Sequence, residues 1–234
     1  MPHDSVVSTH SGTRRGRPPQ TAAQADEVRS RIVDATAAVF TEVGSRGLSV
    51  ARVIEQAAIS RPTFYRYFTN ATAPLDVILT RSNEGLVGGI RTALDGSDEP
   101  VTLGIGIIDA YLEWARGHGA MLRPVFAELH DPASPVSAYR EAAFDDIRAL
   151  VRAKFGELGR AAPNPLDLDA ALHMCEFVVY RLSVTTAPDA EPYPDEAAAA
   201  RLTMIRAVLV TIGRREDVEL ALTIPDIFPA APRQ

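Results

Sequence analysis

The sequence predicts an all-α protein of about nine helices, in which a small N-terminal three-helix unit with a helix-turn-helix precedes a larger helical body. Apolar residues recur at spacings of three and four along most of the chain, and short stretches containing Pro and Gly separate these segments. The sequence has no strand–helix alternation, no Gly-rich phosphate loop and no internal repeat. Between residues 49 and 68, two short amphipathic segments are separated by only two residues, which is the spacing of a helix-turn-helix.

The composition fits a globular protein of a reducing compartment. The chain has 234 residues, 46% apolar and 23% charged, which is enough for a large helical domain and a small one. The single cysteine, Cys175, excludes an internal disulfide framework. No run of about 18 apolar residues predicts a transmembrane helix, and no apolar segment of a secretory signal follows the basic N-terminus. We therefore expect a cytoplasmic protein.

The charge is distributed unevenly. The net charge of −6 would by itself argue against binding to nucleic acid. Residues 1–70, however, contain nine arginines against six acidic residues, whereas residues 71–234 contain fifteen basic and twenty-four acidic residues. Ordinary scatter of charges would also give such a difference, but a basic N-terminal part on an acidic body is typical of a localised DNA-binding surface.

The first residues, 1–22, are polar and contain Pro and Gly, so we expect them to be disordered. Arg14, Arg15 and Arg17 form a compact basic arm directly before the helical part. Such an arm can enter a minor groove, where the negative potential attracts guanidinium groups. A solubilising tail is the alternative interpretation.

The first two helices are predicted from their apolar stripes and caps. The first runs from about Ala23 to Val43, and Gly44 supplies its C-terminal stop. Ser49 caps the second, which ends near Ala57. Their apolar positions are Val28, Ile32, Ala35, Val39 and Phe40 in the first helix, and Val50, Val53, Ile54 and Ala57 in the second.

The third helix begins at Ser60, a good N-cap, and Pro62 stands in its first turn, where a missing N–H costs nothing. Phe64 and Phe68 lie one turn apart and are expected to be core. The remaining side chains, which are cationic or carry hydroxyls, spread around the other faces: Arg61, Thr63, Tyr65, Arg66 and Tyr67. Arginine and tyrosine can bind phosphate oxygens, and arginine can bind guanine.

These residues belong to an ordered set: Arg31, Ile32, Ala35, Phe40, Gly44, Gly47, Ser49, Val50, Ala57, Ile59, Ser60, Thr63, Phe64, Tyr65, Phe68 and Leu75. With this set, residues 31–79 resemble the DNA-binding domain of the TetR family of bacterial transcriptional regulators. The resemblance implies that the third helix of each subunit enters a major groove of operator DNA. The residues expected to contact DNA are Arg14, Arg15, Arg17, Ser49, Arg52, Ser60, Arg61, Thr63, Tyr65, Arg66 and Tyr67.

Two positions depart from the pattern of the family. Ala58 stands in the turn where glycine is usual, so the turn is either strained by roughly 1 kcal/mol or right-handed. Ala71 stands where the family carries a lysine that contacts a phosphate. Asn70 or Thr72 could cap the fourth helix there and offer a weaker phosphate bond. We expect a modest operator affinity as a result.

Six further helices are predicted in the body from their apolar periodicity. Pro74 opens the fourth, with Leu75, Ile78, Leu79, Leu86 and Ile90 on its apolar side, and residues 95–100 end it. The others are expected at Val101–Arg116, Met121–His130, Val136–Leu158, Leu166–Thr185 and Asp195–Arg214. The domain limits expected are 1–22 for the arm, 23–70 for the DNA-binding domain, 71–215 for the body and 216–234 for an unassigned tail.

The resemblance also implies functions for the body. The fourth helix would transmit a ligand signal to the DNA-binding domain, a largely apolar effector would lie within helices four to eight, and the last two helices would form a homodimer. The candidates for effector binding are Tyr111, Trp114, Met121, Phe126, His173, Met174, Phe177 and Arg181. The candidates for the dimer interface are Leu172, Val179, Leu202, Ile205, Leu209 and Ile212. Ordinary core packing would explain many of them equally, and Arg181 could instead pair with an acid across the dimer.

Other classes of protein find little support. His173 and Cys175 lie two apart on a helix and so face different ways, and no other His, Cys or acidic set has the spacing of a metal site. No nucleophile elbow or phosphate loop is present, so we expect neither an enzyme nor a cofactor. We predict a TetR-like repressor that binds operator DNA as a homodimer and is released by a small molecule. A DNA-binding regulator without a small ligand, controlled by a partner or by its own abundance, is the alternative.

Overall fold

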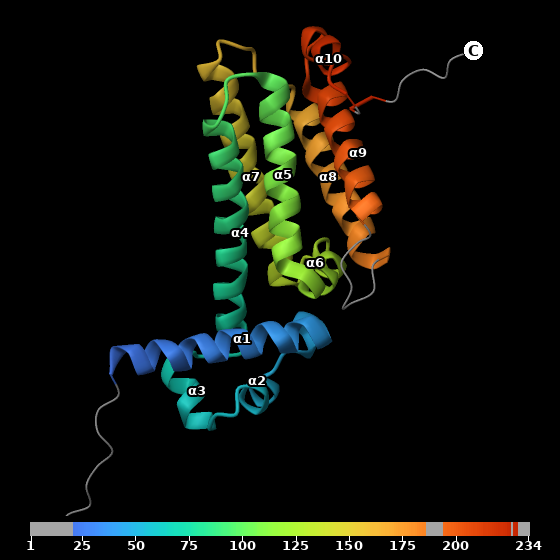
Figure 1. Cartoon of the computed structure of the whole chain (residues 1–234). Coiled ribbons are helices and arrows are strands. Elements are labelled where there is room, and N and C mark those ends of the chain that lie inside the picture. The colour runs from blue at the N-terminus through green and yellow to red at the C-terminus, as the bar shows by residue number, and fades with distance from the viewer. Residues whose placement is uncertain (1–20, 186–193, 226, 229–234) are drawn as a thin grey trace, which may run out of the picture.

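The computed structural model describes residues 21–185, 194–225 and 227–228. Within these ranges the chain forms α-helices and one 3-10 turn and no strand, which confirms the predicted all-α class. Figure 1 shows α1 lying across one end of a bundle of long helices, with α2 and α3 beneath it and α10 at the opposite end. The helices are α1 (Ala22–Gly47), α2 (Val50–Gln56), α3 (Arg61–Tyr67), α4 (Thr72–Asp95), α5 (Pro100–His118), the 3-10 turn η1 (Gly119–Met121), α6 (Leu122–Glu128), α7 (Pro135–Glu157), α8 (Pro165–Thr185), α9 (Pro194–Ile212) and α10 (Arg215–Ala221).

Helix α1 begins with a capping box in which Thr21 and Gln24 each bond to the other's backbone N–H. The predicted stop at Gly44 is present as a break, because Gly44 has a φ of 67° and a ψ of −175°. One more turn follows it and ends at Gly47. The helix is therefore longer than predicted and kinked, and glycine supplies the positive φ that the kink needs.

Helix α4 belongs to both parts of the molecule. It begins at Thr72, two residues before the predicted Pro74, because the Asn70 side chain accepts a hydrogen bond from the Ala73 N–H at 2.8 Å. Its first turns pack with α1, α2 and α3 in one apolar cluster, which includes Ile32, Phe40, Val53, Phe64 and Leu75. Its later turns pack against α5 and α7. One continuous helix thus joins the N-terminal domain to the body.

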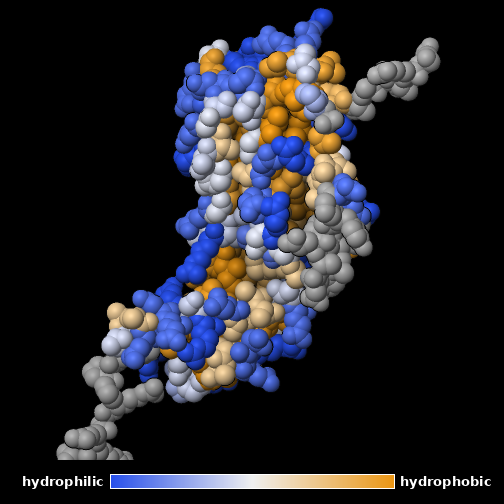
Figure 2. All heavy atoms as spheres, viewed as in Figure 1, coloured by the Kyte–Doolittle hydropathy of each residue, from blue (hydrophilic) through white to orange (hydrophobic). Residues whose placement is uncertain are grey.

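The body is built around two further apolar clusters. One lies between α4, α5, α7 and α8 and includes Ile90, Leu103, Ile147 and Leu168. The other lies between α5, α8, α9 and the C-terminal segment and includes Ile108, Val179 and Met204. Figure 2 shows apolar residues gathered along the upper body, between α5 and α9. The apolar core thus continues to the end of the body that lies away from α1–α3.

The predicted limits of the body helices are close to the observed ones, with two differences. Helix α6 ends at Glu128 rather than at His130, where a turn forms because the Asp131 N–H bonds back to the Glu128 carbonyl. The region predicted as an unassigned tail contains α10, which packs against α5 and α9. Asp217 holds the start of α10 by accepting a hydrogen bond from the Arg214 N–H at 2.8 Å. In the described residues, no helix combines the length and hydropathy that crossing a membrane requires.

Candidate DNA-binding surface and effector cavity

The helix-turn-helix is held by its two serine caps. The Ser49 hydroxyl accepts from the Arg52 N–H at the start of α2, and the Ser60 hydroxyl accepts from the Thr63 N–H at the start of α3, both at 3.3 Å. Between the helices, Ala58 has a φ of 50°. The sequence left two geometries open for this turn, and the chain adopts the left-handed one, which costs about 1–2 kcal/mol for a residue other than glycine.

Helix α3 separates its apolar and polar faces as predicted. Phe64 and Phe68 are buried, and their rings lie 6.1 Å apart. On the outer side, Arg61, Tyr65 and Arg66 are exposed. The Arg61 guanidinium lies 5.6 Å from the centre of the Tyr65 ring and donates a hydrogen bond to the Tyr65 hydroxyl at 3.4 Å. Two of the exposed side chains of α3 therefore contact each other and form an arginine–tyrosine unit.

The other predicted DNA contacts lie around this unit. Arg52 is exposed on α2, and Thr63 and Tyr67 are half-buried on α3. Ser49 and Ser60 use their hydroxyls as helix caps. Arg14, Arg15 and Arg17 lie outside the described residues. Sequence reasoning missed Arg29, an exposed residue of α1 whose guanidinium lies 5.2 Å from the centre of the Phe68 ring.

Ala71 stands where the family carries a lysine, and its methyl side chain offers no polar group to bind a phosphate. Ala71 is the N-cap of α4 and makes no side-chain hydrogen bond. Asn70 supplies the cap, as one of the two predicted alternatives had it, while Thr72 stays exposed. Because the Asn70 oxygen is used by the Ala73 N–H, only its amide N–H groups can donate to a phosphate.

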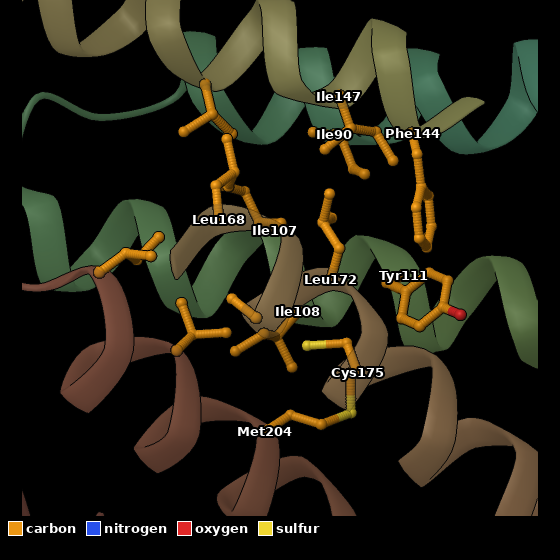
Figure 3. Close-up of a pocket in the computed structure, with 14 residues that line it drawn as sticks. Ile90, Ile107, Ile108, Tyr111, Phe144, Ile147, Leu168, Leu172, Cys175 and Met204 are labelled. Carbon is orange, nitrogen blue, oxygen red and sulfur yellow. The ribbon is translucent and has the colours of Figure 1, made fainter. Parts of the chain in front are cut away.

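A cavity that is partly open to solvent lies in the body between α4, α5, α7, α8 and α9 (Figure 3). The lining side chains are hydrocarbon except for the Tyr111 phenol, the Cys175 thiol and the Met204 thioether. Burial raises the pKa of the Cys175 thiol to about 12 and raises the pKa of Tyr111 above its usual range, so both are neutral near pH 7. The lining residues are Ile90, Ile107, Ile108, Tyr111, Phe144, Ile147, Val151, Leu168, Ala171, Leu172, Cys175, Met204, Val208 and Ile212.

A second cavity, likewise partly open, adjoins the first at the end of the body covered by α10. Four residues line both cavities: Ile107, Val151, Val208 and Ile212. The second cavity also has charged residues on its wall, namely Lys154, Arg160 and Asp217. An ion pair between Arg160 and Asp217 joins the segment after α7 to α10. Burial opposes the charge of Asp217, but its bonds to Arg160 and to the Arg214 N–H lower its pKa.

Of the predicted effector residues, Tyr111 lies on the wall of the first of these two cavities. Trp114 lies behind it, stacked on the Tyr111 ring at 5.5 Å, and its indole N–H donates to the Ser82 carbonyl of α4 at 3.0 Å. Met121 and Phe126 pack against the cluster of the N-terminal domain, and Met174 is half-buried. The remaining three are exposed and do not reach the cavities: His173, Phe177 and Arg181.

Most of the residues predicted for the dimer interface lie towards the interior of the subunit. Leu172 and Ile212 line the cavity, Val179, Ile205 and Leu209 are buried within the subunit, and Leu202 is half-buried. The large apolar residues exposed on α8 and α9 are instead Leu166, Phe177, Tyr180, Val184 and Val210. Both helices carry two apolar stripes, and periodicity does not reveal which of them faces the subunit's own core.

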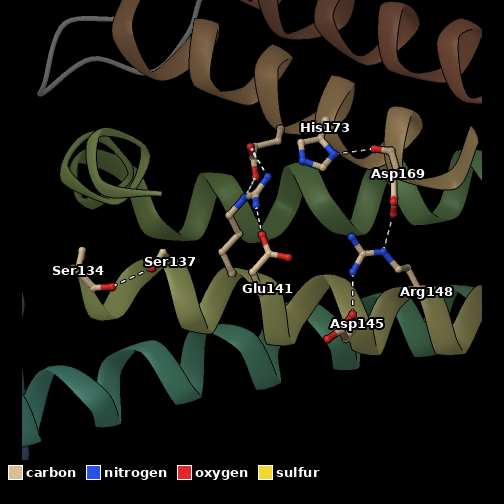
Figure 4. A network of polar contacts seen from close by, with 9 residues as sticks. Ser134, Ser137, Glu141, Asp145, Arg148, Asp169 and His173 are labelled. Carbon is tan, nitrogen blue, oxygen red and sulfur yellow. Dashed lines mark hydrogen bonds and ion pairs between the residues drawn. The ribbon is translucent and has the colours of Figure 1, made fainter. Parts of the chain in front are cut away.

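A buried ion pair, not anticipated from the sequence, lies beside the cavity. Arg140 of α7 donates to Glu176 of α8 through Nε at 2.6 Å and through a terminal nitrogen at 3.1 Å, and both residues are buried. The Arg140 guanidinium also lies 4.6 Å from the centre of the Phe144 ring. Burial is the largest single influence and opposes its charge, but the hydrogen bonds and charges of Glu176 and Glu141 together outweigh it and raise the pKa of Arg140. Figure 4 shows the neighbouring pairs that Arg148 makes with Asp145 and Asp169.

A polar contact joins the body to the kink of α1. Glu128 accepts a hydrogen bond from the Ser45 N–H at 2.7 Å and another from the Ser134 hydroxyl. Next to it, Arg46 pairs with Asp131 at 2.6 Å. A β-carbon on Gly44 would come within 2.6 Å of the Glu128 carboxylate, so glycine is needed here for space as well as for its φ. In the described part of the chain, no three His, Cys, Asp or Glu residues form a group able to hold a metal ion.

Two capped helices with an exposed arginine–tyrosine unit, set on an all-helical body, define a helix-turn-helix transcription regulator. Residues 32–72 match the model of the bacterial regulatory proteins of the tetR family. The N-terminal domain is thus similar to that of this family, and the resemblance expected from the sequence is confirmed.

Known proteins share the rest of the chain more distantly. The HTH-type transcriptional activator FasR of Mycolicibacterium smegmatis is 25% identical over 145 residues, which span 60% of this chain and 64% of that protein. The match thus covers less than two thirds of the relative. SmeT of Stenotrophomonas maltophilia in complex with triclosan has a TM-score of 0.65 and 17% identity, over 88% of this chain and 100% of that one. The fatty acid degradation regulator FadR of Bacillus halodurans has a TM-score of 0.61 and 16% identity, over 76% and 94%. These structures share the fold.

Proposed function

We propose that this chain is a transcriptional repressor that binds operator DNA as a homodimer and leaves it when a largely apolar small molecule enters the body. The observation that carries the proposal is the exposed Arg61–Tyr65 unit on a capped α3, held over buried Phe64 and Phe68. Such a helix can place an arginine against base edges while hydroxyls and further arginines bind phosphates. A regulator of this kind acts in the cytoplasm, where the DNA is.

Within the major groove, Arg61 and Thr63 lie nearest the bases, and Tyr65 and Tyr67 bind phosphates. Arg52 and Arg66 add phosphate contacts from the two sides of the turn. The helices of two subunits must meet successive major-groove faces, about 34 Å apart. The operator is therefore a palindrome or near-palindrome.

The exposed apolar stripe on α8 and α9 supports dimerisation. Phe177 and Val210 are 59% and 65% exposed, and Tyr180 and Val184 lie on the same side of α8 as Phe177. The two helices pack side by side, so Val210 of α9 can combine with the stripe of α8 into one surface. Burying this surface against a second copy removes apolar area from water. Of the predicted interface residues, Val179, Ile205 and Leu209 are buried within the subunit, whereas Leu202 is half-buried.

The cavity supports control by a ligand. Its lining residues carry no charge, and a phenol, a thiol and a thioether are their only groups with heteroatoms, so an apolar molecule fits it best. SmeT is described in complex with triclosan, a bound small molecule in a protein of the same fold. Release of DNA follows if the ligand prefers a geometry of the dimer in which the two α3 helices are wrongly spaced.

The experiment that tests this function is selection of fragmented genomic DNA on the purified protein, followed by titration of the best site. We expect an enriched inverted repeat, bound far more tightly than competitor DNA. A transcription assay on that promoter gives the sign of regulation, since SmeT is described as a repressor and FasR as an activator. If folded, dimeric protein enriches no site, the proposal fails. If it binds a site that no apolar compound affects, control by a partner or by abundance takes its place.

A further inference from the structure

We propose that the two cavities form one elongated site for an unbranched alkyl chain, whose carboxyl or ester end lies beside Arg160. This names the class of ligand and rests on the proposed function only in that the body binds a small molecule. Two observations carry it: the way the cavities follow one another along the helices, and the concentration of polar groups at one end.

The cavities lie in line. On α5 the first is lined by Tyr111, Ile108 and Ile107, and the second continues from Ile107 through Gly104 and Leu103 to Pro100. With a rise of 1.5 Å per residue, this wall is about 16 Å long. The walls on α7 and α9 continue in the same way through the shared residues Val151, Val208 and Ile212. A long and narrow space of this kind suits a flexible chain better than a compact ring system.

The wall of the first cavity is chemically uniform. It offers neither a charge nor a buried carboxylate, and the Tyr111 and Cys175 groups are neutral. The four shared residues have aliphatic side chains and lie where the two cavities meet. A row of methylenes needs no hydrogen bond anywhere along this path, and each one that leaves water raises the affinity roughly fourfold.

The charged side chains that line the cavities all belong to the second one. Arg160 is 90% buried, pairs with Asp217 and lies 5.6 Å from the centre of the Phe155 ring. Its Nε–H is the one buried side-chain polar group in the described residues that finds no hydrogen-bond partner. Such a donor is costly to leave unsatisfied. A carboxylate or ester oxygen on the ligand supplies an acceptor, which orients the chain with its polar end towards α10.

The test measures binding directly and without DNA. Trp114 is the only tryptophan of the chain and stacks on Tyr111 at the far end of the site, so its fluorescence reports a chain that reaches the first cavity. The full-length protein is titrated with hexanoate, decanoate and tetradecanoate, and with adamantane carboxylate as a compact probe. We expect affinity to rise steeply with chain length and the compact acid to bind weakly. A flat series, or tighter binding of the compact acid, overturns the elongated site.

A variant in which the second cavity is filled tests where the alkyl chain of the ligand lies. A β-carbon on Gly104 meets no atom within 4 Å and Gly104 lines the second cavity, so Gly104→Leu fills that cavity without displacing a neighbour near the backbone. Gly88→Leu is the matched control, because Gly88 is an exposed glycine of α4 whose β-carbon also meets nothing. Tetradecanoate should lose at least tenfold in affinity in Gly104→Leu and keep it in Gly88→Leu. Equal affinities in the two variants overturn the proposal.

The polar end is tested with ligands of one chain length. Tetradecanoate and methyl tetradecanoate should both bind, whereas tetradecyltrimethylammonium, which has no acceptor, should bind at least tenfold more weakly. Arg160→Lys keeps the charge opposite Asp217 but removes the Nε donor, and should weaken the acid and the ester about threefold to tenfold. Equal binding of the ammonium compound overturns the placement of the head group. Operator binding is measured on the same preparation, so a protein that binds its operator but gives a flat chain-length series refutes this inference alone.

Discussion

The N-terminal domain and the body use arginine next to an aromatic ring in opposite ways. On α3, Arg61 lies over Tyr65 at the surface, where the guanidinium can still reach a phosphate or a base. In the body, Arg140 lies over Phe144 in the interior, and a bidentate bond to Glu176 uses its charge. The same pair of residue types thus serves recognition in one region and internal structure in the other. What separates the two is burial and the presence of a carboxylate partner, and each can be changed by substitution.

The largest effect is expected from Arg140→Met. The substitution leaves Glu176 buried without its partner and should lower the free energy of unfolding by about 3–5 kcal/mol. The matched change on the surface, Arg61→Met, should stay within about 0.5 kcal/mol. Urea unfolding followed by circular dichroism measures both. Equal losses in the two variants would remove the distinction between a structural and a recognition arginine.

Next in size is Phe177→Asp, which tests the exposed stripe of the body. A charge at the centre of the proposed interface should cost about 2 kcal/mol or more of association free energy and shift the protein towards monomers. Leu222→Asp changes a residue of similar exposure, 61% against 59%, after α10 and should leave the dimer intact. Sedimentation velocity over a range of concentrations gives the result. A dimer that survives Phe177→Asp places the interface elsewhere.

A smaller effect is expected at the DNA. Arg61→Ala should weaken operator binding by about 1–3 kcal/mol and relax specificity at one base position. Arg116→Ala, a change of an exposed arginine in the body, serves as the control. Titration of the operator and of single-base variants measures both quantities. An unchanged isotherm with unchanged base preference would show that Arg61 does not bind a base.

The smallest effect concerns the turn. Ala58→Gly relieves the left-handed alanine and should stabilise the N-terminal domain by up to about 1 kcal/mol, after the greater freedom of glycine in the unfolded chain is counted. Ala57→Gly should do the reverse, because Ala57 has a φ of −77° and is buried. Thermal unfolding of the two variants should therefore move in opposite directions. A destabilised Ala58→Gly would mean that the turn is not strained by its alanine.

The N-terminal domain could be predicted nearly residue by residue because its signals are local. A serine hydroxyl three residues before the N–H that it caps, and two phenylalanines one turn apart, need no information from the rest of the chain. The geometry at Ala58 stayed open because alanine can adopt either hand at a modest cost. Asn70 was one of two possible caps, and the choice depended on how the chain enters α4.

In the body, local signals predict where the helices lie in the sequence, but they do not predict which side of each helix packs inside the subunit. Leu172 and Phe177 are both apolar residues on α8, and sequence reasoning gave Leu172 to the dimer and Phe177 to the ligand, whereas Leu172 lines the cavity and Phe177 is exposed. Helix α10 was missed because part of its support comes from far away, as Arg160 pairs with Asp217 across 57 residues. The partner of Arg140 is 36 residues distant and equally invisible to periodicity.

The kink of α1 gives the N-terminal domain a second point of attachment. If α4 were the only connection to the body, α1–α3 could rotate about that helix. The Glu128 carboxylate, bonded to the Ser45 N–H, holds the domain at a place distant from that helix. The packing of α6 against α1 and the ion pair between Arg46 and Asp131 add to this attachment. The position of the N-terminal domain is therefore set by the α6–α7 connection as well as by α4.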